Sequence, residues 1–362
     1  MSEERSELLR KKLRDWLQIQ HPGYSDLNLS DFSAPEAGAS NETLLFDIQW
    51  QEDGQTHERS LVARLQPEGP GVFPEYELDQ QYRAMSLLAD TDVPVPVLAG
   101  FESDTDVLGT PFYLMERIDG KVIQENPPYH MEGWFTELAP AERREIWENG
   151  LRAAATVNRQ DWQALGFHYL DKPELGDTPL RQQLAYYRRF LDYAEGRGRP
   201  YEKLRACRDW LEANQPAEEP VALCWGDAKA ANLLMDGLEV VGVLDWEMVR
   251  LGNPVDDLAW WITLDDSMSE GLATMVGMDI PKQPGLPGTG EMVALWESES
   301  GFSAEHLDYY LLLGAYKFGI IMASIGIKYT DEGLIPADME MDTKNTCTAL
   351  LERHMAANSI SV

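Results

Sequence analysis

The chain has 362 residues, of which 62 are acidic and 30 are basic, so its formal net charge at pH 7 is −32. This charge argues against a nucleic-acid-binding protein, which neutralises phosphates with clustered Lys and Arg, while the 44% of hydrophobic residues can supply a large core. The three cysteines are too few for a disulfide framework or a cysteine-based metal site, so we expect a cytoplasmic protein.

The N-terminal segment carries acidic residues where a signal peptide has basic ones, and no apolar region follows it. Leu9, Leu13 and Trp16 recur at helical spacing instead, which predicts an amphipathic helix docked on the protein surface. The most apolar later stretch, residues 309–329, has Lys317 at its centre. A membrane-spanning helix needs about 20 apolar residues without a central charge. We therefore expect a core helix there and no membrane association.

The first third of the chain is predicted to be rich in β structure. Residues 44–50 and 60–65 are extended apolar runs, and the polar stretch 51–59 between them contains a glycine, which predicts a hairpin. Residues 75–89 then repeat apolar side chains every three or four positions, which predicts a helix. A short apolar run at 112–118 predicts a further strand.

The remainder of the chain is predicted to be mainly helical. The predicted helices are 140–160, 178–195, 201–213 and 305–329, and the Pro- and Gly-rich stretch 281–290 is predicted to be a loop. A β-rich start followed by helices indicates an α+β fold with two lobes, in line with about two domains for this length. We place the N-terminal lobe at 1–118 and the C-terminal lobe at 119–362.

The centre of the predicted chemistry is a second hairpin, with strands at 232–235 and 240–244 separated by a turn that contains a glycine. Asp227 and Asn232 lie at the start of its first strand and Asp245 follows its second, so the three polar groups share one end of the hairpin. Alone, either aspartate is typical of a turn or a strand end. Together, the three groups are typical of phosphoryl transfer.

In phosphoryl transfer, one carboxylate accepts the proton of the attacking hydroxyl, while an Asn amide oxygen and a second carboxylate hold Mg²⁺ on the nucleotide phosphates. Lys229, two residues after Asp227, can reach the transferred phosphate as a point charge. The alternative for Lys229 is a solvated loop lysine. Glu247 is either a further ligand of the metal or its water, or a solvated side chain. We expect the tryptophans that follow the motif to be core residues: Trp246, Trp260 and Trp261.

Trp225-Gly226-Asp227 with Asn232, followed by LDWE at 244–247 and DLAW at 257–260, resembles the aminoglycoside phosphotransferase/choline kinase-like family, small-molecule relatives of the protein kinases. The resemblance covers most of the chain. It implies a protein-kinase-like fold with a β-rich N-terminal lobe and a mainly helical C-terminal lobe, with ATP and Mg²⁺ as cofactors. The implied roles are catalysis for Asp227, metal binding for Asn232 and Asp245, and support of the catalytic loop for Asp257.

The same resemblance assigns the nucleotide site to the N-terminal lobe. Residues 38–43 look like the nucleotide loop of the family, which places three side chains near the phosphates: Ser40, Asn41 and Thr43. Arg64, on the strand 62–67, takes the position of the usual Lys or Arg, and its forked donors can bind phosphate oxygens. The alternative is an outward-facing strand arginine. Glu116 and Ile118, in the segment that joins the lobes, are expected to present backbone groups to adenine.

Two positions depart from the family pattern. Trp225 replaces the usual His, and we expect it to fill the same space and to donate one N–H. Gln81 stands where the helix 75–89 should supply a Glu to pair with Arg64. Gln81 is expected to point inward and can bind Arg64 without a charge, or Glu77, one turn earlier, can take this role. If neither pairs with Arg64, nucleotide binding is expected to be poor.

These features predict an ATP- and Mg²⁺-dependent kinase for a hydroxyl group of a small molecule. Its partners are then a nucleotide and a hydroxyl acceptor, with no nucleic acid. Similar branches of the family include proteins associated with acyl-CoA dehydrogenase domains, which implies a metabolic acceptor such as a hydroxyacyl-CoA. Two alternatives stay open: an aminoglycoside phosphotransferase, whose polycationic acceptor the acidic chain would attract, and an impaired pseudokinase. The oligomeric state is undetermined. The net charge also predicts that moderate salt strengthens nucleotide binding by screening repulsion.

Overall fold

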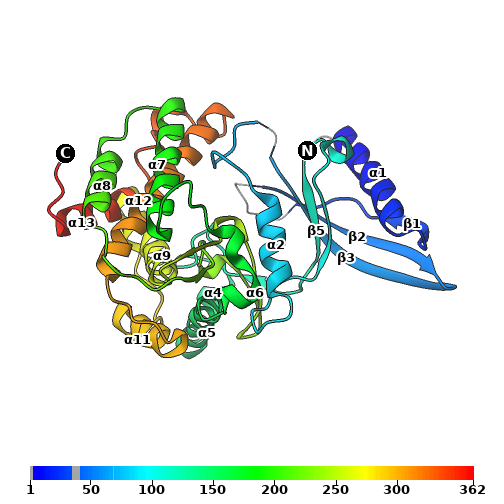
Figure 1. Ribbon diagram of the computed structural model, residues 1–362, viewed down its shortest axis with the longest axis horizontal. Coiled ribbons are helices and arrows are strands. Elements are labelled where there is room, and N and C mark those ends of the chain that lie inside the picture. The colour runs from blue at the N-terminus through cyan, green and yellow to red at the C-terminus, as the bar shows by residue number, and fades with distance from the viewer. Residues whose placement is uncertain (1–2, 35–40, 68) are drawn as a thin grey trace.

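The computed structural model describes residues 3–34, 41–67 and 69–362, and it has the predicted α+β architecture. The N-terminal part is built on a five-stranded antiparallel sheet, and the C-terminal part is mainly helical (Figure 1). The sheet order is β1-β2-β3-β5-β4. Its strands are β1 (Ser25–Leu29), β2 (Glu42–Glu52), β3 (Gln55–Leu65), β4 (Leu98–Glu102) and β5 (Phe112–Glu116).

The predicted first hairpin is present as β2 and β3, but its turn is shorter than the sequence suggested. The strands pair without interruption from Glu42 opposite Leu65 to Glu52 opposite Gln55. Only Asp53 and Gly54 form the turn, both with positive φ (51° and 77°). Two left-handed residues match the twist of paired strands, so the polar stretch expected as a connection forms the ends of the strands instead.

Helix α1 (Glu3–Gln20) lies on the sheet, as its amphipathic pattern predicted. Its Leu9, Leu13 and Trp16 are buried in a hydrophobic core that they share with the sheet and with the short helix α3 (Thr105–Leu108). The Trp16 indole N–H donates to Glu102 Oε2 at 2.8 Å, which ties α1 to β4. This first core belongs to the N-terminal part alone.

Helix α2 (Leu78–Leu88) is shorter than the predicted helix 75–89, because it begins only after Glu77. Its Leu78, Met85 and Leu88 pack into a second, larger core with the C-terminal helices, so α2 lies between the sheet and those helices (Figure 1). The loop before α2 also docks on the C-terminal part. Val72 is buried there, and its carbonyl accepts a hydrogen bond from Ser324 Oγ at 2.6 Å.

The C-terminal part contains the four predicted helices as α5, α7, α8 and α12. Its helices are α4 (Trp134–Glu137), α5 (Pro140–Asn158), α6 (Trp162–Leu165), α7 (Pro179–Arg197), α8 (Glu202–Ala213), α9 (Val255–Asp266), α10 (Leu272–Val276), α11 (Thr289–Ser300), α12 (Leu307–Asp331) and α13 (Thr348–Ala357). The sequence did not predict α9, α11 and α13.

Helix α12 is long and apolar enough to cross a membrane, which among the described residues is true of this helix only. However, 89% of its most apolar window is buried inside the protein, and Lys317 at its centre is paired with Asp256. The expectation of a core helix is therefore confirmed for α12.

The predicted second hairpin consists of β8 (Leu233–Asp236) and β9 (Glu239–Val243), and β6 (Lys121–Val122) pairs with β8. A two-stranded sheet is formed by β7 (Ala222–Cys224), which precedes this hairpin in the chain, and β10 (Arg250–Gly252), which follows it. The segments between these strands include the short helices η2 (Ala230–Asn232) and η3 (Trp246–Met248). The candidate active site is built on these segments. The other short helices are η1 (Phe167–Leu170), η4 (Ser267–Gly271) and η5 (Ala337–Met339).

Candidate active site

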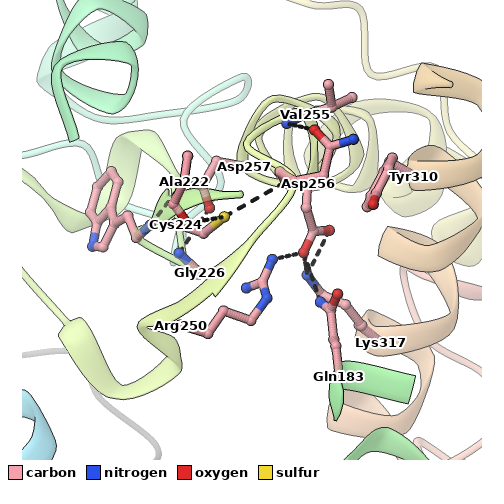
Figure 2. Close-up of polar contacts among 12 residues, drawn as sticks. Gln183, Ala222, Cys224, Gly226, Arg250, Val255, Asp256, Asp257, Tyr310 and Lys317 are labelled. Atoms are coloured by element: carbon pink, nitrogen blue, oxygen red, sulfur yellow. Dashed lines mark hydrogen bonds and ion pairs between the residues drawn. The ribbon is translucent and has the colours of Figure 1, made fainter. Parts of the chain in front are cut away.

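The loop after β7 is fixed from below by Asp257, a fully buried residue in the first turn of α9. Its two carboxylate oxygens accept hydrogen bonds from the backbone N–H groups of Trp225 and Gly226, both at 2.8 Å. Asn158 Nδ2 also donates to Asp257, at 2.7 Å. Figure 2 shows Asp257 beside Gly226. The structure thus confirms that Asp257 supports this loop, as the family resemblance implied.

Gly226 allows the loop to turn toward the site. Its φ is 90°, in the region that favours glycine, and a Cβ at this position would lie 1.9 Å from the carbonyl oxygen of Met248. Both the φ angle and the close approach of Met248 therefore exclude a side chain at position 226. Only glycine allows the backbone conformation that precedes Asp227.

Asp227 is buried, and both of its carboxylate oxygens are held. Asn232 Nδ2 donates to Asp227 Oδ2 at 2.7 Å, and the indole N–H of Trp260 donates to Asp227 Oδ1, also at 2.7 Å. Because the amide nitrogen of Asn232 is used in this way, its carbonyl oxygen is the atom that can bind a cation. The predicted pair of Asp227 and Asn232 is thus brought together.

Lys229 lies beside this pair, with Nζ 3.6 Å from Asp227 Oδ2 and 3.1 Å from Glu125 Oε2. Burial disfavours its charge, but the carboxylates of Asp227, Glu125 and Asp245 outweigh this effect and raise the pKa of Lys229 above its usual range. Lys229 is therefore a fixed positive charge at the site. Glu125, its second partner, was not singled out from the sequence.

Asp245 follows the second strand of the hairpin, at the same end as Asn232, and contacts the N-terminal sheet. Arg64 Nη2 donates to Asp245 Oδ1 at 3.1 Å, and Arg64 Nη1 donates to Thr43 Oγ1, also at 3.1 Å. Although burial disfavours the charge of Arg64, Asp245 and other nearby groups raise the pKa of its guanidinium above its usual range. The arginine therefore points toward the segment after the hairpin and not outward.

A second contact joins the N-terminal part to the segment after the hairpin, since Asn41 Nδ2 donates to Glu247 Oε2 at 3.1 Å. Glu247 is thus not a purely solvated side chain. Two buried polar atoms in this region, Asn41 Oδ1 and Arg64 Nε, have no hydrogen-bond partner within the protein. Buried polar atoms normally have partners. The donor Arg64 Nε fits a nucleotide phosphate oxygen, whereas Asn41 Oδ1 is an acceptor and fits an N–H or O–H group or a cation. Ser40 lies outside the described residues.

The residues predicted to bind Mg²⁺ also fit that ion. Asn232 and Asp245 offer amide and carboxylate oxygens, and the backbone bond from Leu244 N to Asn232 O (2.9 Å) holds their segments together. Within the described ranges, no group of three or more His, Cys, Asp and Glu side chains is placed to hold a metal. Two protein ligands are sufficient for Mg²⁺ on a nucleotide, because the phosphates and water supply the others.

Glu116 and Ile118 lie at and just beyond the end of β5, where the chain passes from the sheet to the C-terminal part. The N–H of Glu116 donates to Val97 O at 2.7 Å, and the N–H of Arg117 donates to Ser60 O at 2.9 Å. These two N–H groups are used within the sheet, so adenine recognition at this segment would depend on its carbonyls and on the backbone of Ile118.

The predicted link between α2 and Arg64 is not found. Gln81 does point inward and is 2% exposed, but it accepts a hydrogen bond from the Tyr113 hydroxyl at 3.2 Å. Glu77 precedes the helix and forms an ion pair with Lys172 at 3.0 Å. The carboxylate partner of Arg64 is Asp245 instead, at 3.1 Å.

Trp225 behaves as expected of a substitute for His. It is fully buried, and its indole N–H donates to the carbonyl of Leu244 at 2.8 Å, directly before Asp245. Trp246, Trp260 and Trp261 are buried as predicted, but the contact of Trp260 with Asp227 was missed. The spacing indicated only that Trp260 shares a helix face with Asp257, three residues earlier, and not that it reaches Asp227.

Comparison with known proteins shows which family the chain resembles. Residues 31–279 match the family model described as "Phosphotransferase enzyme family". A Gallus gallus protein named acyl-CoA dehydrogenase family member 11 is 26% identical over 304 residues, covering 81% of this chain and 36% of that protein. The Mus musculus family member 10 is 29% identical over 205 residues, covering 56% and 18%. The chain thus spans about a third or less of the length of these relatives.

Solved structures with the same architecture include a Ralstonia eutropha protein provisionally assigned as an aminoglycoside phosphotransferase. It has a TM-score of 0.68 and 22% identity, covering 97% of this chain and 99% of that one. The GDP complex of aminoglycoside 2′-phosphotransferase-IIIa has a TM-score of 0.54 and 15% identity, covering 96% and 99%. At these identities the likeness shows a shared, protein-kinase-like fold.

Proposed function

The chain belongs to the phosphotransferase enzyme family, and on that premise we propose that it is an ATP- and Mg²⁺-dependent kinase for a hydroxyl group of a small molecule. One observation carries this proposal. A buried carboxylate, Asp227, is oriented by two short hydrogen bonds beside a fixed cation, Lys229, at the end of a hairpin that also presents Asp245. Positioning and electrostatic stabilisation supply most of the catalysis in phosphoryl transfer.

Asp227 acts in this proposal on the acceptor hydroxyl. The acceptor oxygen attacks the γ-phosphorus, and the bond from that phosphorus to the β–γ bridging oxygen breaks, so that ADP leaves with the electron pair. Asp227 takes the proton of the attacking hydroxyl. Lys229, 3.6 Å from Asp227, stabilises the negative charge on the phosphoryl group in transfer.

The nucleotide is held between the sheet and the hairpin. Arg64, Asn41 and Thr43 donate hydrogen bonds to phosphate oxygens, which gives a partner to the buried Arg64 Nε that lacks one in the protein. Asn232 and Asp245 hold Mg²⁺, which when bound neutralises charge on the phosphates. The backbone carbonyls of Glu116 and Ile118 complete the nucleotide site of this proposal.

For the acceptor, we propose a metabolic hydroxy compound such as a hydroxyacyl-CoA. The names of the similar animal proteins support this class, because acyl-CoA is the substrate class in those names. A cationic acceptor such as an aminoglycoside is the second candidate. It is favoured by the two carboxylates beside Lys229, Asp227 and Glu125, and by the net charge of −32, which would attract a polycation.

The test uses the purified chain with Mg·ATP and two acceptor panels in parallel, hydroxyacyl-CoA thioesters and aminoglycosides. Phosphorylation is measured as ADP release together with the mass gain of the acceptor. Asp227→Ala should abolish transfer, whereas Asp236→Ala, at an exposed position of the same hairpin, should leave it intact. Transfer to neither panel, together with an ATP-induced thermal shift that depends on Mg²⁺, would identify a pseudokinase instead.

A further inference from the structure

The indole of Trp260 occupies a position that neither the family resemblance nor the comparisons assign. Its N–H lies 2.7 Å from Asp227 Oδ1, and the side chain is only 2% exposed. We propose that Trp260 is a positioning residue that fixes the orientation of the Asp227 carboxylate, and that the buried ion pair of Lys317 and Asp256 holds the indole in place. The role in catalysis rests on the proposed function, whereas the hydrogen bond does not.

The hydrogen bond from Trp260 determines which lone pairs of Asp227 remain for an acceptor. Asn232 engages one carboxylate oxygen and Trp260 engages the other, so the carboxylate cannot rotate without breaking a charge-assisted hydrogen bond. Each oxygen still has a second lone pair that can accept the hydroxyl proton. Without the indole, the remaining partners of the carboxylate, Asn232 and Lys229, both act on Oδ2, and Asn232 is also expected to bind the metal.

The face of the Trp260 ring is covered by a buried cation. Lys317 Nζ lies 4.6 Å from the ring centroid, within the range of a cation–π interaction. The Phe318 ring contacts Trp260 edge-on, with centroids 6.1 Å apart. These two neighbours on α12 enclose the indole, so its N–H has a single direction.

Lys317 is in turn held by Asp256. Its Nζ lies 3.0 and 3.1 Å from the two carboxylate oxygens of Asp256, which also contacts Arg250 and accepts a hydrogen bond from Gln183 at 2.7 Å. Figure 2 shows Asp256 at the centre of these three side chains. A buried ion pair is often no more stabilising than apolar residues would be, but it can impose one arrangement. Here the ion pair holds the Trp260 indole, and the indole in turn holds the Asp227 carboxylate.

The chain contains a matched control for Trp260. Trp261 is the next residue on α9, is equally buried at 2% exposed, and has an indole N–H without a hydrogen-bond partner. Replacing either tryptophan with phenylalanine removes one indole N–H and a similar volume. Only Trp260→Phe removes a contact to Asp227.

The first experiment reads the contact directly, whatever the activity. In ¹H–¹⁵N spectra of the full chain, the Trp260 indole signal is identified by its loss in Trp260→Phe, and the Trp261 signal by its loss in Trp261→Phe. Asp227→Ala should move the Trp260 signal upfield and leave the Trp261 signal in place. Equal small shifts of both signals would overturn the proposed contact.

The second experiment measures steady-state kinetics with the acceptor found above. Trp260→Phe should lower kcat about 10- to 100-fold, the cost expected of a misplaced catalytic group, and leave KM for ATP unchanged. Trp261→Phe should stay close to the wild-type kcat. A tryptophan analogue with sulfur in place of the N–H, inserted at position 260, keeps the ring and should reproduce the loss of kcat if Trp260→Phe does not fold.

The two proposals fail in different ways. A wild-type chain without any transfer that depends on Asp227 would overturn the proposed function, and the spectra would then decide the contact alone. An active wild-type chain whose kcat survives both Trp260→Phe and the sulfur analogue would overturn the positioning role.

Discussion

The guanidinium of Arg64 is paired with the carboxylate of Asp245, with 3.1 Å between Nη2 and Oδ1. This pair joins β3 of the N-terminal sheet to the segment after β9 in the C-terminal part, so the arginine proposed to bind phosphate and the aspartate proposed to bind Mg²⁺ already adjoin. Both side chains are mostly shielded from solvent, at 14% and 24% exposed. Their proximity places the charges of nucleotide and metal in one small region.

Replacing Arg64 should weaken nucleotide binding far more than it affects folding of the sheet. We expect Arg64→Met to raise KM for ATP about 10- to 100-fold, because a hydrogen bond between charged groups contributes about 1.5–3 kcal/mol. The control is Arg59→Met on the same strand, where Arg59 pairs with Glu116 at 3.3 Å and is more exposed. A KM for ATP that rises equally in both variants would contradict a specific role of Arg64.

Asp245 has a φ of 59°, the left-handed conformation that residues with a side chain rarely adopt. Asp245→Ala and Asp245→Gly remove the same carboxylate, but only the glycine variant relieves this backbone strain. We expect the glycine variant to be about 1 kcal/mol more stable than the alanine variant. Urea unfolding of the two proteins measures this difference. Equal midpoints would mean that the backbone at 245 relaxes without cost.

Asp256 neutralises two buried cations, so its loss should cost more than the loss of either cation. Burial and the neighbouring Arg250 lower the pKa of Lys317, and the Asp256 carboxylate at 3.0 Å opposes this effect and favours the charged amine. We expect Asp256→Asn to lower the free energy of unfolding by about 3–5 kcal/mol, because Lys317 and Arg250 then lack a counter-charge. Lys317→Met should cost less, since Asp256 keeps Arg250. Chemical denaturation of both variants measures these losses. A loss for Lys317→Met that equals or exceeds the loss for Asp256→Asn would contradict the shared role of Asp256.

His354, buried on α13, should make folding sensitive to mild acid. Burial, with a contribution from Arg353, lowers its pKa from 6.5 to about 4. The folded protein therefore takes up fewer protons than the unfolded chain, so stability present above pH 6.5 is lost as the pH falls toward 4. His354→Gln should reduce the loss of unfolding free energy between pH 7 and pH 5. The same change at the exposed His168 should not, and an unchanged slope in His354→Gln would exclude this cause.

The parts of the site that the sequence predicted are local in the chain. Asp227 and Asn232 are five residues apart, and a short hairpin returns the chain to Asp245, so spacing alone was enough to propose that they meet. Asp257 is also close in the chain, since only η3 and β10 separate Asp245 from the start of α9. The same holds for the helices α5, α7, α8 and α12, whose apolar periodicity is contained within each segment.

The parts that were missed depend on contacts between distant segments. The partner of Arg64 lies 181 positions later in the chain, so a helical pattern near Gln81 could not reveal it. In the same way, Trp260 was correctly assigned to the core from its neighbours in sequence. Only the folded chain shows that its one polar atom faces Asp227, 33 positions earlier.

Asp256 and Asp257 are consecutive, yet one faces Lys317 and Arg250 while the other holds the backbone of Trp225 and Gly226. Consecutive residues on a helix point about 100° apart, so this division depends on where α9 begins. A change of one residue in the connection from β10 to α9 would rotate both carboxylates away from their partners at once. We therefore expect an insertion or deletion in this connection to disrupt the catalytic loop and the Lys317 ion pair together.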